Sequence, residues 1–437
     1  MKSPTRALLI AALVLPLLHA CGGNSDEDQG SVRLINATSD FALLDASRDD
    51  DGMVYGVAAG TGSGYSNLDE DDYTFKIAQS GSGTVAASIG GSVSAGSHYA
   101  LLAYASGASL QVSYLTEDEG APNSGQAKLR FMNTAGVEAG AVDVYVGQVA
   151  CNALASSATA IAAASGLSTA TSATAPTGYT AFGAGTYHVC VTSSGNKSDL
   201  RLDIPALTLG NQQIATLVLT RSSGGMLVNG LLVSQQGGVA KNANLSTRVR
   251  VVANTSVATD MVSATVNGTT VASNYPPATI GSYRLVTAGT LNVTVNGAAV
   301  DVGTAAAPSG GDLTVLVTGD VASPRVSVIT DDNTPSTSTA QPVKLRLVNG
   351  VNGLTGSVTL TLDSDVIGDD IEFATASRPA TVEASDRLAT IVASSGSSRL
   401  WQITNQPLTT GKVYTVFLLG TLSASNVSDS TQVRADR

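Results

Sequence analysis

The sequence predicts an all-β protein made of tandem antiparallel β-sandwich domains of the immunoglobulin or transthyretin kind. Alternating Val, Leu and Thr segments recur between Gly- and Ser-rich turns along the whole chain. No long stretch has helical periodicity, apart from an Ala-, Ser- and Thr-rich tract at residues 153–177. The 437 residues are too many for a single hydrophobic core, so we expect several domains.

The first twenty residues have the features of a cleaved bacterial lipoprotein signal peptide. Lys2 and Arg6 give a positive start, and residues 7–18 form an apolar run too short to span a bilayer. The sequence Leu-His-Ala-Cys at residues 18–21 matches a lipobox, which predicts cleavage before Cys21 and acylation of that cysteine. The alternative is an ordinary signal peptide followed by an incidental cysteine.

The segment that follows, residues 21–30, is small, acidic and flexible in composition, as expected of a tether. Removal of residues 1–20 takes away two basic side chains and no acidic ones, so the net charge of −11 becomes −13. This balance argues against nucleic-acid binding, which needs a basic surface. We expect an exported protein held at the cell envelope by acyl chains such as palmitate on Cys21, more than one chain being needed for durable anchoring. Gly22 after the cysteine favours the outer membrane if the cell has two membranes.

A strand motif that contains one arginine occurs four times. The arginines are Arg33, Arg130, Arg250 and Arg346, separated by 97, 120 and 96 residues, and an Asn follows three residues later except in the third copy, which has one extra residue. The repeats predict four sandwiches at residues 31–118, 127–236, 247–333 and 343–437. Polar linkers between them predict units strung as beads with limited freedom.

Other landmarks keep the same register. Tyr65 and Tyr73 in the first repeat, and Tyr179 and Tyr187 in the second, are eight residues apart. The last segments of repeats one and three are also similar in sequence, Val-Ser-Tyr-Leu-Thr-Glu-Asp at 112–118 and Val-Ser-Val-Ile-Thr-Asp-Asp at 326–332. We expect the apolar residues of the opening strand to face the core, its arginine to lie on the other face or an edge, and the tyrosines to form tyrosine corners. A sugar-stacking aromatic platform is the alternative use of the tyrosines.

These strand and turn motifs resemble the bacterial envelope family called domain of unknown function 4397. The resemblance rests on the opening strands, on Val-Asp-Val-Tyr-Val at residues 142–146 and on the Gly-Thr-Tyr turn at 185–187, and it is fullest in the second repeat. It implies antiparallel β-sandwiches in secreted or lipid-anchored surface proteins. It brings no catalytic residues.

Residues able to do chemistry are scattered. His98 and His188 occupy different positions of different repeats, which gives no basis for a catalytic triad or a histidine metal site. Acidic runs at residues 49–51 and 69–72 lack the alternating spacing of a calcium loop, and Trp401 is expected to be a core or edge residue. The sequence therefore predicts no catalytic residues, no cofactor and no metal site.

Cys151 and Cys190 remain once Cys21 is acylated, and both lie in the second repeat. An oxidising compartment favours a disulfide between them, with free thiols as the alternative. The second repeat carries about 17 extra residues, and the Ala-rich tract within them is expected either to form a short helix around residues 153–164 or to remain mobile. Reduction of the disulfide is expected to destabilise the second repeat alone.

Three functions compete. The favoured hypothesis is a non-enzymatic, lipid-anchored envelope protein that acts as a structural, spacer or adhesion module toward an unknown envelope or extracellular partner. The alternative is a polysaccharide- or calcium-binding envelope protein. An enzyme is disfavoured because no repeat gathers polar residues that the others lack.

Overall fold

The computed structural model describes residues 28–437 apart from 108, 171–175, 424–425, 428–431 and 437. Cys21, the signal peptide and most of the expected tether therefore lie outside the described residues. The described chain is all-β and forms repeated sandwich-like units, each with two facing sheets around its own hydrophobic core. Its helical elements are one short α-helix, α1 (Gly136–Ala139), and the 3-10 turns η2 (Cys151–Ala153) and η3 (Ala162–Ala164). Among the described residues, no helix is both long enough and apolar enough to span a membrane.

Unit one contains strands β1 to β9. Its first sheet has the order β4-β1-β8-β9, with β5 also on β1, and its second has the order β3-β2-β6-β7. The bounds are β1 (Gln29–Asn36), β2 (Leu43–Arg48), β3 (Asp51–Ala58), β4 (Thr61–Gly62), β5 (Ser66–Asp69), β6 (Asp71–Gln79), β7 (Val85–Val93), β8 (His98–Ser106) and β9 (Ser109–Thr116). Strand β1 begins two residues inside the expected tether, because Gln29 and Gly30 pair with β5.

Unit two contains strands β10 to β17, in sheets β12-β10-β15-β16-β17 and β11-β13-β14. The bounds are β10 (Gln126–Asn133), β11 (Val142–Gly147), β12 (Thr180–Gly183), β13 (Gly185–Ser193), β14 (Asn196–Leu209), β15 (Ile214–Arg221), β16 (Val228–Ser234) and β17 (Val239–Asn242). The structure differs here from the expected linker and from the helix alternative for the Ala-rich tract. The expected linker after residue 236 contains β17, which pairs with β16, and the tract around 153–164 forms the separate turns η2 and η3 instead of a continuous helix.

Units three and four repeat the plan. Unit three has sheets β21-β18-β27-β28, with β22 on β18, and β20-β19-β24-β25, plus the ribbon β23-β26; unit four has β32-β29-β36-β37, with β33 on β29 and β38 on β36, and β31-β30-β34-β35. The bounds in unit three are β18 (Ser246–Thr255), β19 (Val262–Val266), β20 (Thr269–Tyr275), β21 (Thr279–Ile280), β22 (Arg284–Thr287), β23 (Gly289–Thr290), β24 (Val293–Val295), β25 (Ala298–Val300), β26 (Ala306–Ala307), β27 (Asp312–Asp320) and β28 (Ser323–Asp331). Those in unit four are β29 (Val343–Asn352), β30 (Val358–Leu362), β31 (Asp365–Ile371), β32 (Thr375–Ala376), β33 (Ala380–Val382), β34 (Ser385–Ser395), β35 (Ser398–Leu408), β36 (Val413–Ser423), β37 (Asn426–Val427) and β38 (Gln432–Ala435).

The first sheet of each unit is mixed, which corrects the expectation of purely antiparallel sandwiches. The opening strand pairs in parallel with a late strand in all four units: β1 with β8, β10 with β15, β18 with β27, and β29 with β36. A parallel pair needs a long crossover, and here the whole second sheet supplies it. The four repeat arginines occupy equivalent places, opposite Ala100, Thr216, Thr314 and Thr415 in that order.

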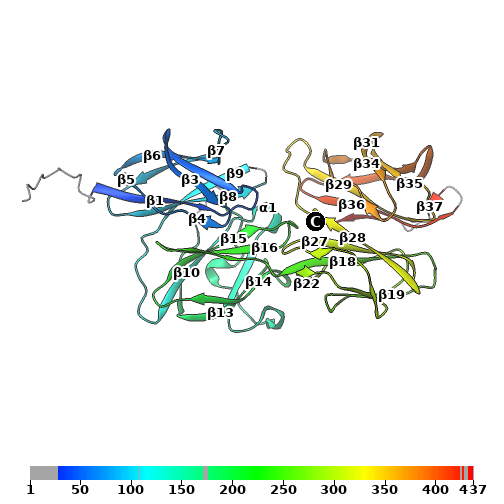
Figure 1. The fold of residues 1–437 in the computed structure, drawn as a ribbon, viewed down its shortest axis with the longest axis horizontal. Helices are drawn as coiled ribbons and strands as arrows, with labels where there is room; N and C mark the ends of the chain where they lie inside the picture. The colour runs from blue at the N-terminus through cyan, green and yellow to red at the C-terminus, as the bar shows by residue number, and fades with distance from the viewer. Residues whose placement is uncertain (1–27, 108, 171–175, 424–425, 428–431, 437) are drawn as a thin grey trace, which may run out of the picture.

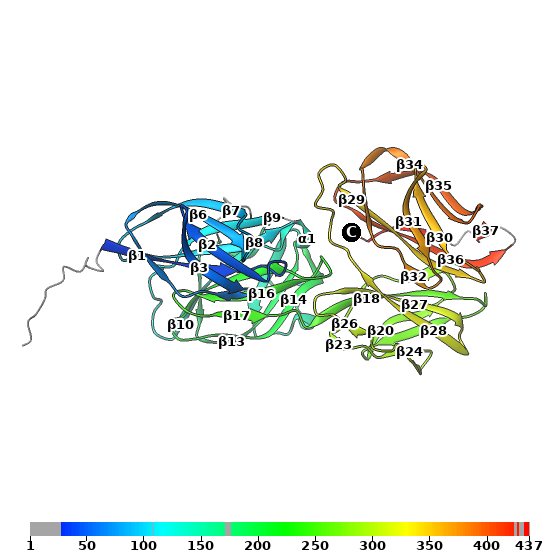
Figure 2. The ribbon, with the colours of Figure 1, turned by 45° about the horizontal axis from the view of Figure 1, so that its top comes forward.

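The units are packed in two pairs, not strung as separate beads. In Figures 1 and 2, unit one lies against unit two, and unit four lies against unit three. We call units one and two the first pair and units three and four the second pair. A buried apolar cluster lies between the units of the first pair and includes Ile35, Tyr104 and Met132, and another lies between those of the second pair and includes Val252 and Phe417.

The opening strand explains the pairing. Within β1, Val32 and Leu34 belong to the core of unit one, whereas Ile35 belongs to the apolar cluster between the units. Because side chains alternate across a strand, Arg33 shares the outer face with Ile35. The sheet is therefore buried on both faces, and the outer face meets the neighbouring unit.

Candidate functional site

The repeat arginines connect the units of each pair. Arg33 is 3% exposed and makes a two-point contact with the carboxylate of Glu117 in its own unit, with Nε 2.7 Å from Oε2. The same guanidinium donates to the carbonyls of Ser234, at 2.8 Å, and of Gly237, both in unit two. Arg130 of unit two reaches back and donates to the carbonyl of Thr116 in unit one, at 3.3 Å. The contact is thus reciprocal.

Tyrosines at the first landmark position pack on these arginines. The guanidinium of Arg33 lies 5.2 Å from the ring centre of Tyr65, and that of Arg130 lies 4.6 Å from the ring centre of Tyr179. The hydroxyl of Tyr65 also donates to Glu117. Burial raises the pKa of Tyr65, and the neighbouring Glu117 raises it further, so the phenol stays protonated and remains a donor.

The tyrosines at the second landmark position behave as expected for tyrosine corners. The hydroxyl of Tyr73 donates to the carbonyl of Asp69 at 3.0 Å, and that of Tyr187 donates to the carbonyl of Gly183 at 2.7 Å. Both bonds reach back four residues. These side chains stabilise the entry into β6 and β13.

In the second pair the arginines meet carboxylates across the interface. Arg250 of unit three binds both oxygens of Asp436 in unit four, with Nη2 3.0 Å from Oδ2. Arg346 of unit four binds Asp331 of unit three and donates to the carbonyl of Thr330 at 3.1 Å. Arg250 also lies 3.6 Å from Asp331, which therefore has two arginine neighbours.

Asp331 is the centre of this buried network. Its Oδ2 accepts hydrogen bonds from the hydroxyls of Thr314 and Tyr283, each at 2.6 Å. Burial by itself would raise the pKa of Asp331, but the charges of Arg250 and Arg346 outweigh it and hold that pKa below its usual value. Since its carboxylate is already saturated with donors, the network is suited to holding two units together.

The asparagine at the end of the opening strand makes different hydrogen bonds in the first and third repeats. Asn36 donates to the carbonyls of Phe41 and Val57, both at 3.0 Å, and so connects its strand to the second sheet of the same unit. In the third copy the extra residue moves Asn254 into the second-pair interface. There it donates to the carbonyl of Gly350 and accepts from the amide of Gly420 at 2.8 Å.

The structure does not bring the sequence candidates for chemistry together. His98 lies 3.0 Å from Asp118 in unit one, and His188 lies 3.7 Å from Asp203 in unit two. Among the described residues, one group has the spacing of metal ligands: Cys151, His188 and Asp203. The sulfur of Cys151 is already used by a disulfide, so this group lacks a thiolate.

Acids of the two runs in unit one make local contacts. Asp50 pairs with Lys76 at 2.7 Å, and a hydrogen bond from that lysine lowers the pKa of Asp50. Asp69 accepts from Gln29 at 2.9 Å, and Asp72 accepts from Ser92. Trp401 is half-buried against the core of unit four.

Cys151 and Cys190 form a disulfide, which confirms that prediction. Their Cα atoms are 5.5 Å apart, and the bond ties η2 to β13. Lys197 holds the same inserted segment by donating to the carbonyls of Ala155, Ser156 and Ala158. The inserted segment also adds to the second sheet of unit two, because Leu167 forms a β-bridge with Val142 of β11.

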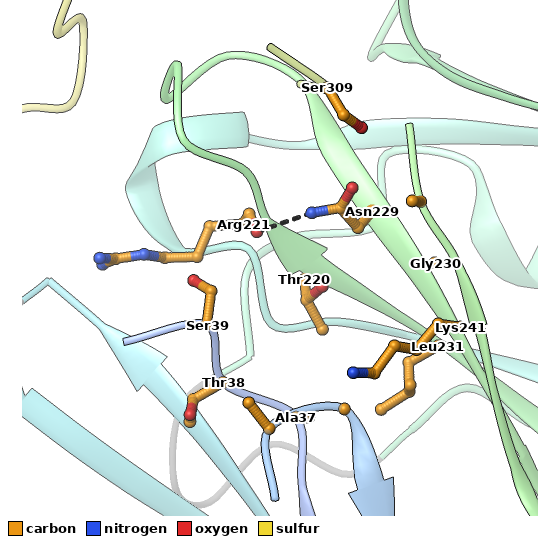
Figure 3. Close-up of a pocket in the computed structure, with 13 residues that line it drawn as sticks. Ala37, Thr38, Ser39, Thr220, Arg221, Asn229, Gly230, Leu231, Lys241 and Ser309 are labelled. Carbon is orange, nitrogen blue, oxygen red and sulfur yellow. Dashed lines mark hydrogen bonds between the residues drawn. The ribbon is translucent and has the colours of Figure 1, made fainter. Parts of the chain in front are cut away.

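A cavity of about 350 Å³ lies where units one, two and three meet (Figure 3). Ala37 and Gly60 of unit one, Thr220 and Lys241 of unit two, and Ser309 of unit three all line it. Sequence reasoning missed this site because its residues come from three repeats and carry no motif. It also missed the acids that bind the arginines, although Glu117 and Asp331 occupy matching places in the closing segments of repeats one and three.

Comparison with known protein families supports the repeated organisation of the chain. A family model described as a domain of unknown function (DUF4397) matches residues 30–145 and 247–352, about half of the chain. Each match spans one unit and continues into its partner, the first through the opening strand β10 into β11 and the second to the end of the opening strand β29. The expectation that the second repeat carries the fullest match was wrong, since the first match ends at residue 145 within unit two. No curated protein matches the chain significantly.

Proposed function

The chain belongs to the DUF4397 family, and from this premise we propose that it is a non-enzymatic, lipid-anchored envelope protein whose paired β-sandwiches act as a rigid spacer and interaction module. The observation that carries the proposal is the reciprocal arginine contact within each pair, supported by apolar clusters on the outer sheet faces. Such interfaces restrict motion between neighbouring units, which a spacer requires.

Contacts between the two pairs support the same idea. The hydroxyl of Ser222 in unit two donates to the carbonyl of Gly310 in unit three at 2.8 Å, and the amide of Gly224 donates to the same carbonyl at 3.0 Å. A Cβ on Gly224 would lie 2.8 Å from backbone atoms of unit three, so this close approach depends on glycine. Small-angle scattering of the purified protein tests the rigidity: the proposal expects one compact particle, and the profile of a flexible string of four beads would contradict it.

The anchor is part of the proposal. The lipobox at residues 18–21 supports acylation of Cys21, and the acidic segment behind it supports a tether at the envelope, in the outer membrane of a cell with two membranes. Metabolic labelling with palmitate should mark the wild-type protein in the membrane fraction and should not mark Cys21→Ser. Label that persists on the variant would overturn the lipoprotein assignment. The immunoglobulin- or transthyretin-like fold class and an envelope or extracellular partner belong to the same proposal.

A further inference from the structure

We propose that the cavity between units one, two and three binds a small anionic sugar, such as a uronic acid. The cavity has the size of a small-molecule site. Its floor and walls combine apolar carbons of Ala37 and Leu231 with the hydroxyl of Thr220 and the amine of Lys241. This combination suits a ring with a carbon face, hydroxyl groups and one negative charge.

The second pair carries a different residue at the place that corresponds to Ala37. Ala37 and Asn254 each lie four residues after their repeat arginine, and Arg221 and Gly420 each lie five residues after the threonine opposite such an arginine. In the second pair, the side chain of Asn254 bridges to Gly420 through a hydrogen bond from the Gly420 amide. In the first pair the corresponding Ala37 has no side chain that could make such a bridge, and it lines the cavity.

The charge in the cavity favours an anion. Two cationic side chains line it, Arg221 and Lys241, and no carboxylate side chain does. Arg221 is already bound to Asp40 and to the carbonyl of Gly107. Within the part of the chain that the structure describes, the side-chain amine of Lys241 makes no hydrogen bond or ion pair, while its backbone belongs to the β16–β17 ladder. Its amine points into the cavity toward Thr220 and Ala37 in Figure 3.

Lys241 is an exposed side chain that lies beside Gly60 of unit one. Its aliphatic carbons lie against Gly60, where an added Cβ would come within 2.1 Å of the Lys241 Cε. Gly60 also has φ +69°, a conformation that favours glycine. The absence of a side chain at Gly60 thus leaves room for the Lys241 side chain at the cavity, where its amine can face a ligand carboxylate.

The test is a calorimetric titration of the full-length protein with glucuronate, compared with glucose and inorganic phosphate. We expect glucuronate to bind at least tenfold more tightly than either comparator. Lys241→Met keeps the aliphatic stem and removes the charge, and Ala37→Asn introduces the larger residue found at the corresponding place in the second pair. Each variant should weaken glucuronate binding at least tenfold.

Lys412→Met, at an exposed lysine of unit four, is the matched control and should bind like the wild type. Thermal unfolding at the wild-type temperature establishes that each variant is folded. If Ala37→Asn does not fold, Lys241→Met alone tests the proposal. Failure of the wild type to bind glucuronate, or unchanged binding by folded Lys241→Met, would overturn the proposal. Phosphate or glucose binding as tight as glucuronate binding would overturn the assignment to an acidic sugar.

Discussion

At the first-pair interface, Arg33 binds a carboxylate of its own unit and only carbonyls of the partner, whereas in the second pair Arg250 and Arg346 bind carboxylates of the partner unit. Arg130 of the first pair has a hydroxyl and a carbonyl as partners. The same architecture is therefore held by different chemistry. An apolar cluster around Tyr104 and Met132 and the partly exposed ion pair of Arg221 with Asp40 join the units of the first pair, while buried ion pairs join those of the second.

The largest expected loss of stability follows from replacing Asp331, the central carboxylate of the second pair. Asp331→Asn leaves Arg250 and Arg346 buried with an uncompensated charge, which costs about 3–5 kcal/mol of unfolding free energy. Denaturant unfolding followed by fluorescence of Trp401, the sole tryptophan, reports on unit four. The exposed Asp365→Asn is the control and should change little; an equally small effect of Asp331→Asn would remove the distinction between the pairs.

Removal of the disulfide should destabilise the first pair and leave the second pair unchanged. Cys151→Ala with Cys190→Ala opens a loop of about 40 residues and should cost unit two roughly 3–4 kcal/mol. Because unit one shares a buried interface with unit two, hydrogen exchange should accelerate in both units. This revises the expectation that unit two alone responds. The Trp401 transition should stay in place, and a shift in it would show that the two pairs unfold together.

A smaller effect is expected at the tyrosine that supports Arg33. Tyr65→Phe keeps the ring against the guanidinium but removes the hydrogen bond to Glu117, a charged acceptor, so unit one should lose about 1.5–3 kcal/mol. Hydrogen exchange of β1 measures the loss. Tyr55→Phe is the matched control, since that side chain is 74% exposed, and equal behaviour of the two variants would argue against a role for the Tyr65 hydroxyl.

The smallest effect expected is a pH dependence of the second pair. The folded-state pKa of Asp331 lies below its ordinary value of 3.8, so its contribution to stability is present above about pH 4 and is lost as the pH falls through the folded-state pKa. Burial raises the pKa of Asp312, whose contribution has the opposite sign. Comparing wild type with Asp331→Asn by Trp401 fluorescence between pH 7 and 3 isolates the Asp331 part, and parallel curves would contradict it.

The repeat, the sandwich-like units and the disulfide could be predicted from the sequence because each leaves a local pattern. The pairing also left a signal, in the motif itself. Val32, Leu34 and Ile35 place apolar residues on both faces of one strand, which is typical of a sheet buried on both sides. The partner of that outer face could not be predicted, since Ser234 and Asp436 lie far along the chain and carry no motif. The cavity could not be predicted from the sequence for the same reason.

The central claim is that arginines of one unit are energetically coupled to residues of its partner. A double-mutant cycle with Arg250→Met and Asp436→Asn, followed by Trp401 fluorescence in denaturant, tests it most directly. We predict a coupling energy of about 1–3 kcal/mol, because the two side chains are buried and in contact across the interface. Additive effects, within about 0.5 kcal/mol, would show that the units do not depend on this contact and would contradict the account.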